Sequence, residues 1–125
     1  MINNRKSWIY VKFQREGIHK YPAALTDPKL ATGGADDVSF LGYPHRHMFH
    51  FNVRLEIFHD DRDVEFIKFK REIMNYMNDK YGDKECLKFV KMSCEMIAKE
   101  LLNEFKLIKC EVSEDNENGA IVYGE

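Results

Sequence analysis

The chain has 125 residues, of which 44% are hydrophobic, and a net charge of −2. This length suits a single domain with its own core, and interspersed charges exclude the basic patch of a nucleic-acid-binding protein. No apolar run approaches the ~18 residues of a membrane span, and residues 1–7 lead into a strand pattern instead of a signal peptide. The sequence therefore predicts one cytoplasmic domain, residues 1–125, that binds neither nucleic acid nor membranes, whereas a nucleotide-sized ligand stays compatible.

The first third of the chain predicts a strand and a long loop. Apolar and polar residues alternate over residues 8–16, which is typical of a half-buried strand. Gly17 is expected to end this strand, and His19 follows it. Residues 21–37 contain two prolines and two glycines without periodicity, so we expect a loop. Long loops in compact domains are usually functional or disordered, and this one is predicted to cover a ligand pocket.

Residues 44–57 predict a long central strand in which one face is apolar apart from two histidines. His45 and His47 open the face that Phe49, Phe51 and Val53 continue. Side chains at i and i+2 lie roughly 6–7 Å apart on one side of a strand, within reach of a shared ion. Neutral imidazole is the commonest metal ligand, but zinc needs three or four ligands. From the spacing alone, the pair is either part of a metal site or a polar pair hydrogen-bonded to a loop.

The second half predicts two helices followed by two strands. Apolar residues recur at helical spacing over residues 64–79, after N-cap candidates in residues 60–63, and Ser93 is expected to cap a second helix. Residues 107–112 and 120–123 alternate as strands. Long alternating strands favour antiparallel pairing with one face covered. The predicted fold is α+β, a four-stranded antiparallel sheet with two helices on one face, in the order ββααββ.

That order, with a histidine after the first strand and an HxH pair opening the second, resembles the T-fold of the 6-pyruvoyl-tetrahydropterin synthase and 6-carboxytetrahydropterin synthase family. The resemblance covers most of the chain as short motifs, which are His19, His45 with His47, residues 64–70, residues 93–98 and Glu114. It implies a homo-oligomer, a trimer or hexamer, and a zinc ion held by His19, His45 and His47. It also implies that the carboxylate of Glu114 accepts hydrogen bonds from the N–H edge of a pterin-like ring.

The helix start beginning Ser93, Cys94, Glu95 resembles the family motif P-T-x-E-N-x-A, so these residues are further ligand-binding candidates. Two simpler interpretations stay open. Glu95 is favoured near a helix N-terminus by the helix dipole whatever the function. Glu114 in a turn-rich segment would ordinarily be a solvated residue.

The departures from the family concern its acid–base groups. Ser39 stands where the family has a catalytic cysteine, and Asp83 lies in the region of the family's Asp-His pair without a histidine. A serine hydroxyl is a far weaker base than a thiolate. Ser39 and Asp83 are therefore the weak catalytic candidates, and the sequence favours a protein that binds a purine- or pterin-like ring or a nucleotide without the family's catalysis.

Two other functions stay open, a zinc-dependent tetrahydropterin synthase-like lyase and a scaffold without a ligand. The chain also resembles small uncharacterised phage and prophage proteins. If that resemblance holds, binding would serve to sequester a host nucleotide signal.

Overall fold

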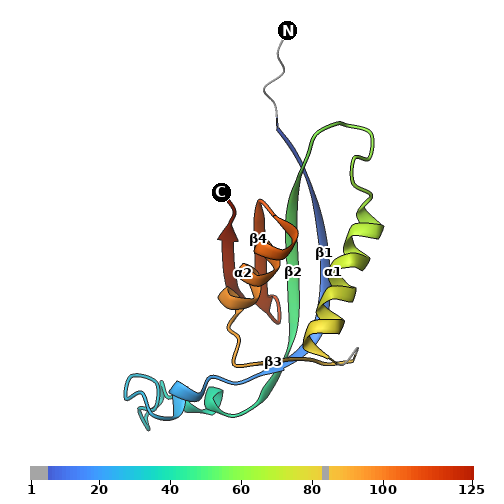
Figure 1. The fold of residues 1–125 in the computed structure, drawn as a ribbon. Helices are drawn as coiled ribbons and strands as arrows, with labels where there is room; N and C mark the ends of the chain where they lie inside the picture. Colours follow the sequence, from blue (N-terminus) through green and yellow to red (C-terminus); the bar gives the residue numbers. More distant parts are fainter. Residues whose placement is uncertain (1–5, 83–84) are drawn as a thin grey trace.

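The protein is described by a computed structural model that covers residues 6–82 and 85–125. The fold is α+β, as predicted (Figure 1). The strands are β1 (Ser7–His19), β2 (His45–Ile57), β3 (Leu87–Val90), β4 (Lys109–Glu114) and β5 (Asn118–Tyr123). The helices are α1 (Phe66–Tyr81) and α2 (Cys94–Phe105), and two short 3-10 turns, Pro22–Leu25 and Ser39–Gly42, lie between β1 and β2.

The sheet is mixed and has five strands in the order β3-β1-β2-β4-β5. The predicted four-stranded antiparallel sheet is therefore wrong, because β3 pairs in parallel with the end of β1. Sequence reasoning missed β3 because it has only four residues, with Leu87 and Phe89 buried and the alternate residues exposed. So short an alternation carries little signal, and the partner strand lies far earlier in the chain.

Both helices pack on one face of the sheet, the face that carries the odd-numbered residues of β2. Figure 1 shows α1 along β1 and α2 against β4. Phe49, Phe51 and Val53 are almost fully buried in this layer. The helices add Ile73 and Met77 from α1 and Ile97 and Leu101 from α2 to the same buried cluster. A continuous core therefore fixes the strands whose ends carry the histidines.

Gly17 does not end the first strand, as the sequence analysis expected, and β1 continues to His19. A Cβ atom at Gly17 would lie 2.6 Å from a ring carbon of Phe89 and 2.8 Å from one of Phe49. The two rings meet edge to face with their centroids 4.9 Å apart. Glycine therefore stands at this position because the rings need the space, and β1 continues to His19, which is paired with His45 of β2.

One of the two predicted helix N-caps is confirmed. Ser93 caps α2, as predicted, by accepting a hydrogen bond from the amide of Met96 at 3.2 Å. The cap predicted for α1 within residues 60–63 is wrong, because the carboxylate of Glu65 accepts the amide of Lys68 at 2.8 Å. Asp63 instead accepts the amide of Phe58. Within the described residues, neither helix combines the length and apolar character needed to cross a membrane.

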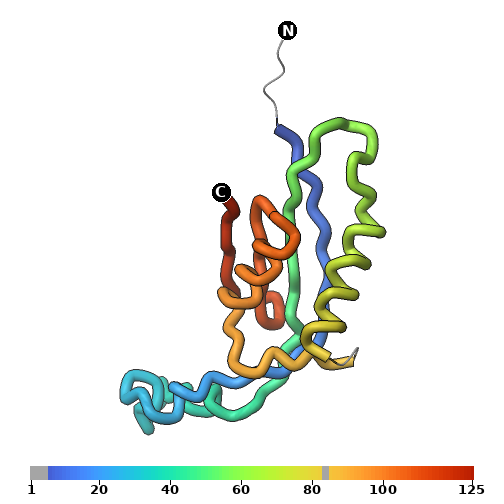
Figure 2. Tube along the Cα trace, viewed as in Figure 1, coloured from blue at the N-terminus to red at the C-terminus, as the bar shows by residue number. Residues whose placement is uncertain are grey.

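The segment of residues 20–44 projects away from the sheet beyond the ends of β1 and β2 (Figure 2). It contains both 3-10 turns, so it is more ordered than the predicted loop. Its exposed side chains include Tyr21, Phe40 and Tyr43. The expectation that residues 21–37 cover a pocket is wrong for most of their length, since only Tyr21 of this range lines the hollow beside the histidines.

Candidate metal centre

The strand register brings three histidines and one glutamate to the same end of the sheet. His19 is paired with His45 across β1 and β2, and His47 is paired with Gly17. Glu114 ends β4 opposite Phe49 of β2. One ligand atom from each of His19, His45, His47 and Glu114 lies within 4.8 Å of all the others. These four residues could hold a metal ion, and three of them are the histidines that the sequence analysis grouped.

Each histidine uses its Nδ1 nitrogen in a hydrogen bond directed away from the cluster. The acceptors are the carbonyl of Met92 for His19 at 2.8 Å, the carbonyl of Tyr43 for His45 at 2.8 Å, and Oδ2 of Asp115 for His47 at 2.7 Å. Carbonyl and carboxylate oxygens only accept, so Nδ1 carries the proton in all three rings. The Nε2 lone pairs are thereby left for the cluster, an arrangement common among metal-binding histidines.

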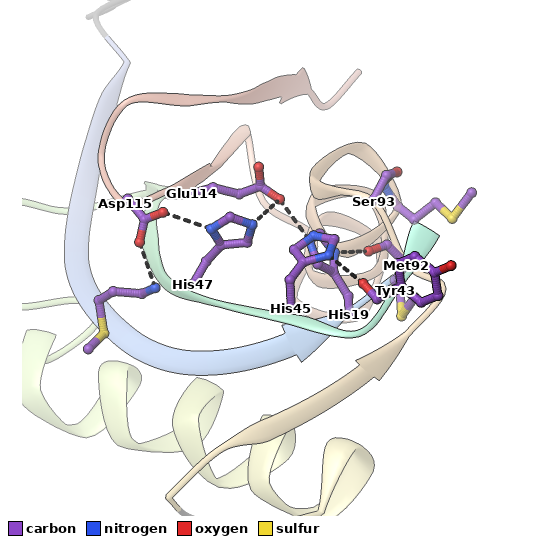
Figure 3. Close-up of polar contacts among 10 residues, drawn as sticks. His19, Tyr43, His45, His47, Met92, Ser93, Glu114 and Asp115 are labelled. Carbon is purple, nitrogen blue, oxygen red and sulfur yellow. Dashed lines mark hydrogen bonds and ion pairs between the residues drawn. The ribbon is translucent and has the colours of Figure 1, made fainter. Parts of the chain in front are cut away.

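The Nε2 atoms face a carboxylate instead of a donor. Those of His19 and His47 are buried and have no hydrogen-bond partner within the described part of the chain. Oε2 of Glu114 lies 2.8 Å from Nε2 of His19 and 3.5 Å from Nε2 of His47 (Figure 3). In neutral rings these lone pairs repel the anionic oxygen, and a metal cation, or a second proton on the ring, makes the contact favourable.

The spacing of these atoms suits a small metal cation. Around a tetrahedral ion with bonds of about 2.0–2.1 Å, ligand atoms lie about 3.3–3.4 Å apart. The two separations between Glu114 and the imidazoles, 2.8 Å and 3.5 Å, lie on either side of that value. These two spacings fit a metal ion, and His45 offers a further ligand atom within 4.8 Å of the other three.

Asp115 orients His47 and was missed by the sequence analysis. Its Oδ1 accepts the amide of Met48 at 2.9 Å, while its Oδ2 accepts Nδ1–H of His47 (Figure 3). The amide of Met48 first, and then His47, lowers the pKa of the Asp115 carboxyl. Asp115 has a φ of 56°. Aspartate and asparagine are enriched in this left-handed region, so the Asp115-Asn116 pair in a turn was the available signal.

A hollow of about 540 Å³ lies beside the cluster, at the start of α2. This volume is typical of small-molecule sites, which occupy about 300–1,000 Å³. All four predicted ligand-binding residues line it, namely Ser93, Cys94, Glu95 and Glu114, together with His19 and His45. The candidate ligand residues therefore share this hollow with two of the three candidate metal histidines, whereas His47 does not line it.

The remaining candidates do not add a reactive group. Burial foremost, and then the charges of Glu114 and Glu95, raise the pKa of Cys94 to about 12, so its thiol stays protonated. The hydroxyl of Ser39 donates to Asp37 at 2.5 Å, and Ser39 is not among the residues that line the hollow. Asp83 lies outside the described residues.

Replacement of Asp115 by asparagine should weaken metal binding. An amide has one accepting oxygen and one donating nitrogen, so either His47 or Met48 loses its acceptor. Loss of such a support for a metal ligand typically costs about 10–100-fold in metal affinity. Competition with a chromophoric zinc chelator measures this affinity. Glu117→Gln removes the same charge from an exposed position in the same turn and should change nothing. Equal affinity of Asp115→Asn and wild type would show that Asp115 does not support the centre.

Comparisons with known proteins support the fold alone. No protein-family description matches the chain, and no curated protein matches it either. Among solved structures, the chain is similar to the uncharacterized protein WS1659 from Wolinella succinogenes. The TM-score is 0.59 at 15% sequence identity, over 98% of this chain and 100% of that one. The two proteins therefore share a fold across their whole lengths.

Proposed function

We propose that this is a zinc-binding T-fold protein that takes a flat purine- or pterin-like ring, or a nucleotide carrying such a ring, in the hollow beside the metal. One observation carries the proposal. Three imidazoles have their protons fixed on Nδ1 by outward hydrogen bonds, so their Nε2 atoms face a shared space that borders a ligand-sized hollow. A solvated polar cluster would not need all three rings held in the same tautomer.

Zinc suits this set of donors better than the harder divalent ions do. Imidazole nitrogen is a favourable ligand for zinc, whereas magnesium and calcium prefer shells made wholly of oxygen. A bound zinc ion would act as a Lewis acid towards an oxygen atom of the ligand. The three histidines would hold the ion, while Met92, Tyr43 and Asp115 keep the rings in place.

Recognition of the ring would depend on Glu114. A guanine-like edge presents an amino group and a ring N–H side by side, and one carboxylate can accept both in parallel. Glu114 contacts the histidines and also lines the hollow. Lys20 and Lys91 also line the hollow. Their positive charges suit the phosphates of a nucleotide.

Binding without turnover is favoured because the family's reactive thiolate and its Asp-polarised imidazole have no counterpart beside the metal site in the described residues. Cys94 stays protonated, and Ser39 donates to Asp37 away from the hollow. The imidazole of His47, which Asp115 orients, directs its other nitrogen to the metal cluster. The alternative is a zinc-dependent tetrahydropterin synthase-like lyase, and the complete histidine trio of the family's metal site is the observation that favours it.

The first test compares metal content and ligand binding. Wild type should contain zinc by emission spectroscopy, and the double variant His45→Ala/His47→Ala should lose it. The matched control is His50→Ala/His59→Ala, which removes two histidines outside the cluster and should keep the metal. Small molecules that copurify are identified by mass spectrometry, and guanine nucleotides and pterins are titrated by calorimetry.

Three results would count against this proposal. Zinc absent from wild type and control alike would remove the metal site. If no ring compound copurifies and none binds in the calorimetric titrations, the proposed ligand class would be wrong. Rapid zinc-dependent consumption of dihydroneopterin triphosphate, followed by the pterin spectrum, would establish the lyase instead.

We also propose that the chain assembles as a trimer or hexamer. β3 and β5 form the two edges of the sheet, and free edges are normally paired or covered. The projecting segment of residues 20–44 exposes 50% of Tyr21, 63% of Phe40 and 63% of Tyr43. Exposed apolar groups mark an interface where they form a contiguous patch, and these three aromatic side chains of one segment are our candidates for such a contact.

Light scattering on the purified protein measures the assembly. We expect a mass of three or six times the 14.8 kDa of one chain. Replacement of Phe40 and Tyr43 by serine should shift the distribution towards smaller species if the projecting segment forms the contact. A single species of 14.8 kDa in wild type would overturn the proposed assembly.

A further inference from the structure

The two neighbouring carboxylates at the end of β4 are held in very different ways. Asp115 is fixed by two hydrogen bonds, from His47 and from the amide of Met48. The Glu114 side chain has polar contacts only with the imidazoles of His19 and His47 among the described residues. When both rings are neutral, with the proton on Nδ1, neither Nε2 can donate to Glu114, so these two contacts alone do not fix its carboxylate.

We propose that Glu114 closes the fourth position of the metal centre when the hollow is empty, and that a ligand must displace its carboxylate in order to reach the metal. This inference rests on the proposed zinc site. It gives Glu114 a role in addition to the recognition of a ring, because the same carboxylate then serves the metal and the ligand in turn.

The position of Glu114 permits both roles. Its backbone is fixed, because it is paired with Phe49 on one side and with Asn118 on the other. Its side chain is 27% exposed and borders the hollow that Asn118 and Gly119 also line. Rotation about side-chain bonds could therefore move the carboxylate from the imidazoles into the hollow without movement of the strand.

A closed centre limits which compounds can bind. Structural zinc sites have four protein ligands, whereas catalytic sites keep one position for water or substrate. A compound that offers only a metal ligand would have to compete with the carboxylate of Glu114. A ring with two adjacent N–H donors and a nearby oxygen or nitrogen atom could occupy the metal position while its donors bind the displaced carboxylate. The ligand class is therefore a ring that carries both features together.

Cobalt(II) substitution tests this inference without any enzymatic readout. The visible spectrum of bound cobalt reports its ligands, and azide is a small anion that binds to open positions. We expect the spectrum of wild type to resist azide. The spectrum of Glu114→Gln should respond at concentrations at least about tenfold lower, because an amide is a weaker ligand than a carboxylate.

Two further variants and one control make the result specific. Glu114→Asp keeps the charge but is one methylene shorter, so it should open the position as Glu114→Gln does. Asp115→Asn should weaken cobalt binding yet leave the bound ion as resistant to azide as in wild type. Glu117→Gln should match wild type in both measurements. Circular dichroism verifies that each variant is folded.

The outcomes separate this inference from the proposed function. Equal azide sensitivity of cobalt-loaded wild type and both Glu114 variants would overturn the role of Glu114 while leaving the metal site intact. Failure of wild type to bind either cobalt or zinc would overturn the metal site, and the inference with it. Azide sensitivity confined to the Glu114 variants is the result expected.

Discussion

The candidate centre depends on three hydrogen bonds that leave the cluster instead of entering it. Each imidazole donates from Nδ1 to an oxygen outside the cluster, and the three acceptors come from separate segments of the chain. In a neutral ring whose proton is on the outer nitrogen, the inner nitrogen acts as an acceptor or a metal ligand. The tautomer thus directs three nitrogen lone pairs to one space at this end of the sheet, an arrangement that suits a metal cation.

The fold supplies those acceptors through elements that also build the core and the hollow. Met92, whose carbonyl binds His19, directly precedes Ser93, the cap of α2. The start of α2 is therefore tied to a candidate metal ligand, and the same helix start lines the hollow. On the other side, the turn after β4 presents Glu114 and Asp115 to the histidines in succession. Metal, ligand and fold would therefore respond together to changes at the start of α2 or in the turn after β4.

Part of the site could be predicted because its residues follow the alternating pattern of a single strand. His45 and His47 interrupt an otherwise apolar strand face, and parity alone places them on the same side. His19 and Glu114 lie far from that strand in sequence, so they were grouped with it only through the resemblance to a family. The structure brings both to the pair, and it places Oε2 of Glu114 2.8 Å from Nε2 of His19.

The features that sequence reasoning missed depend on distant partners or on single backbone conformations. β3 is a strand because it pairs with β1, and a pattern of four residues is too short to predict that pairing. Asp115 reaches His47 because of its positive φ, which a turn-rich composition suggests but does not locate. Gly17 was expected to end a strand, whereas a glycine is required there because two phenylalanine rings occupy the space of a side chain. The α+β class and the two covering helices were correctly predicted because their periodicities extend over many residues.

X-ray absorption at the zinc edge of the purified protein tests the central claim most directly. The account predicts a first shell of nitrogen and oxygen alone at about 2.0–2.1 Å, with the outer-shell scattering of several imidazoles. Sulfur at about 2.3 Å would instead indicate that cysteines hold the metal. That result, or a spectrum unchanged by His45→Ala/His47→Ala, would contradict the assignment of the histidines as the metal ligands.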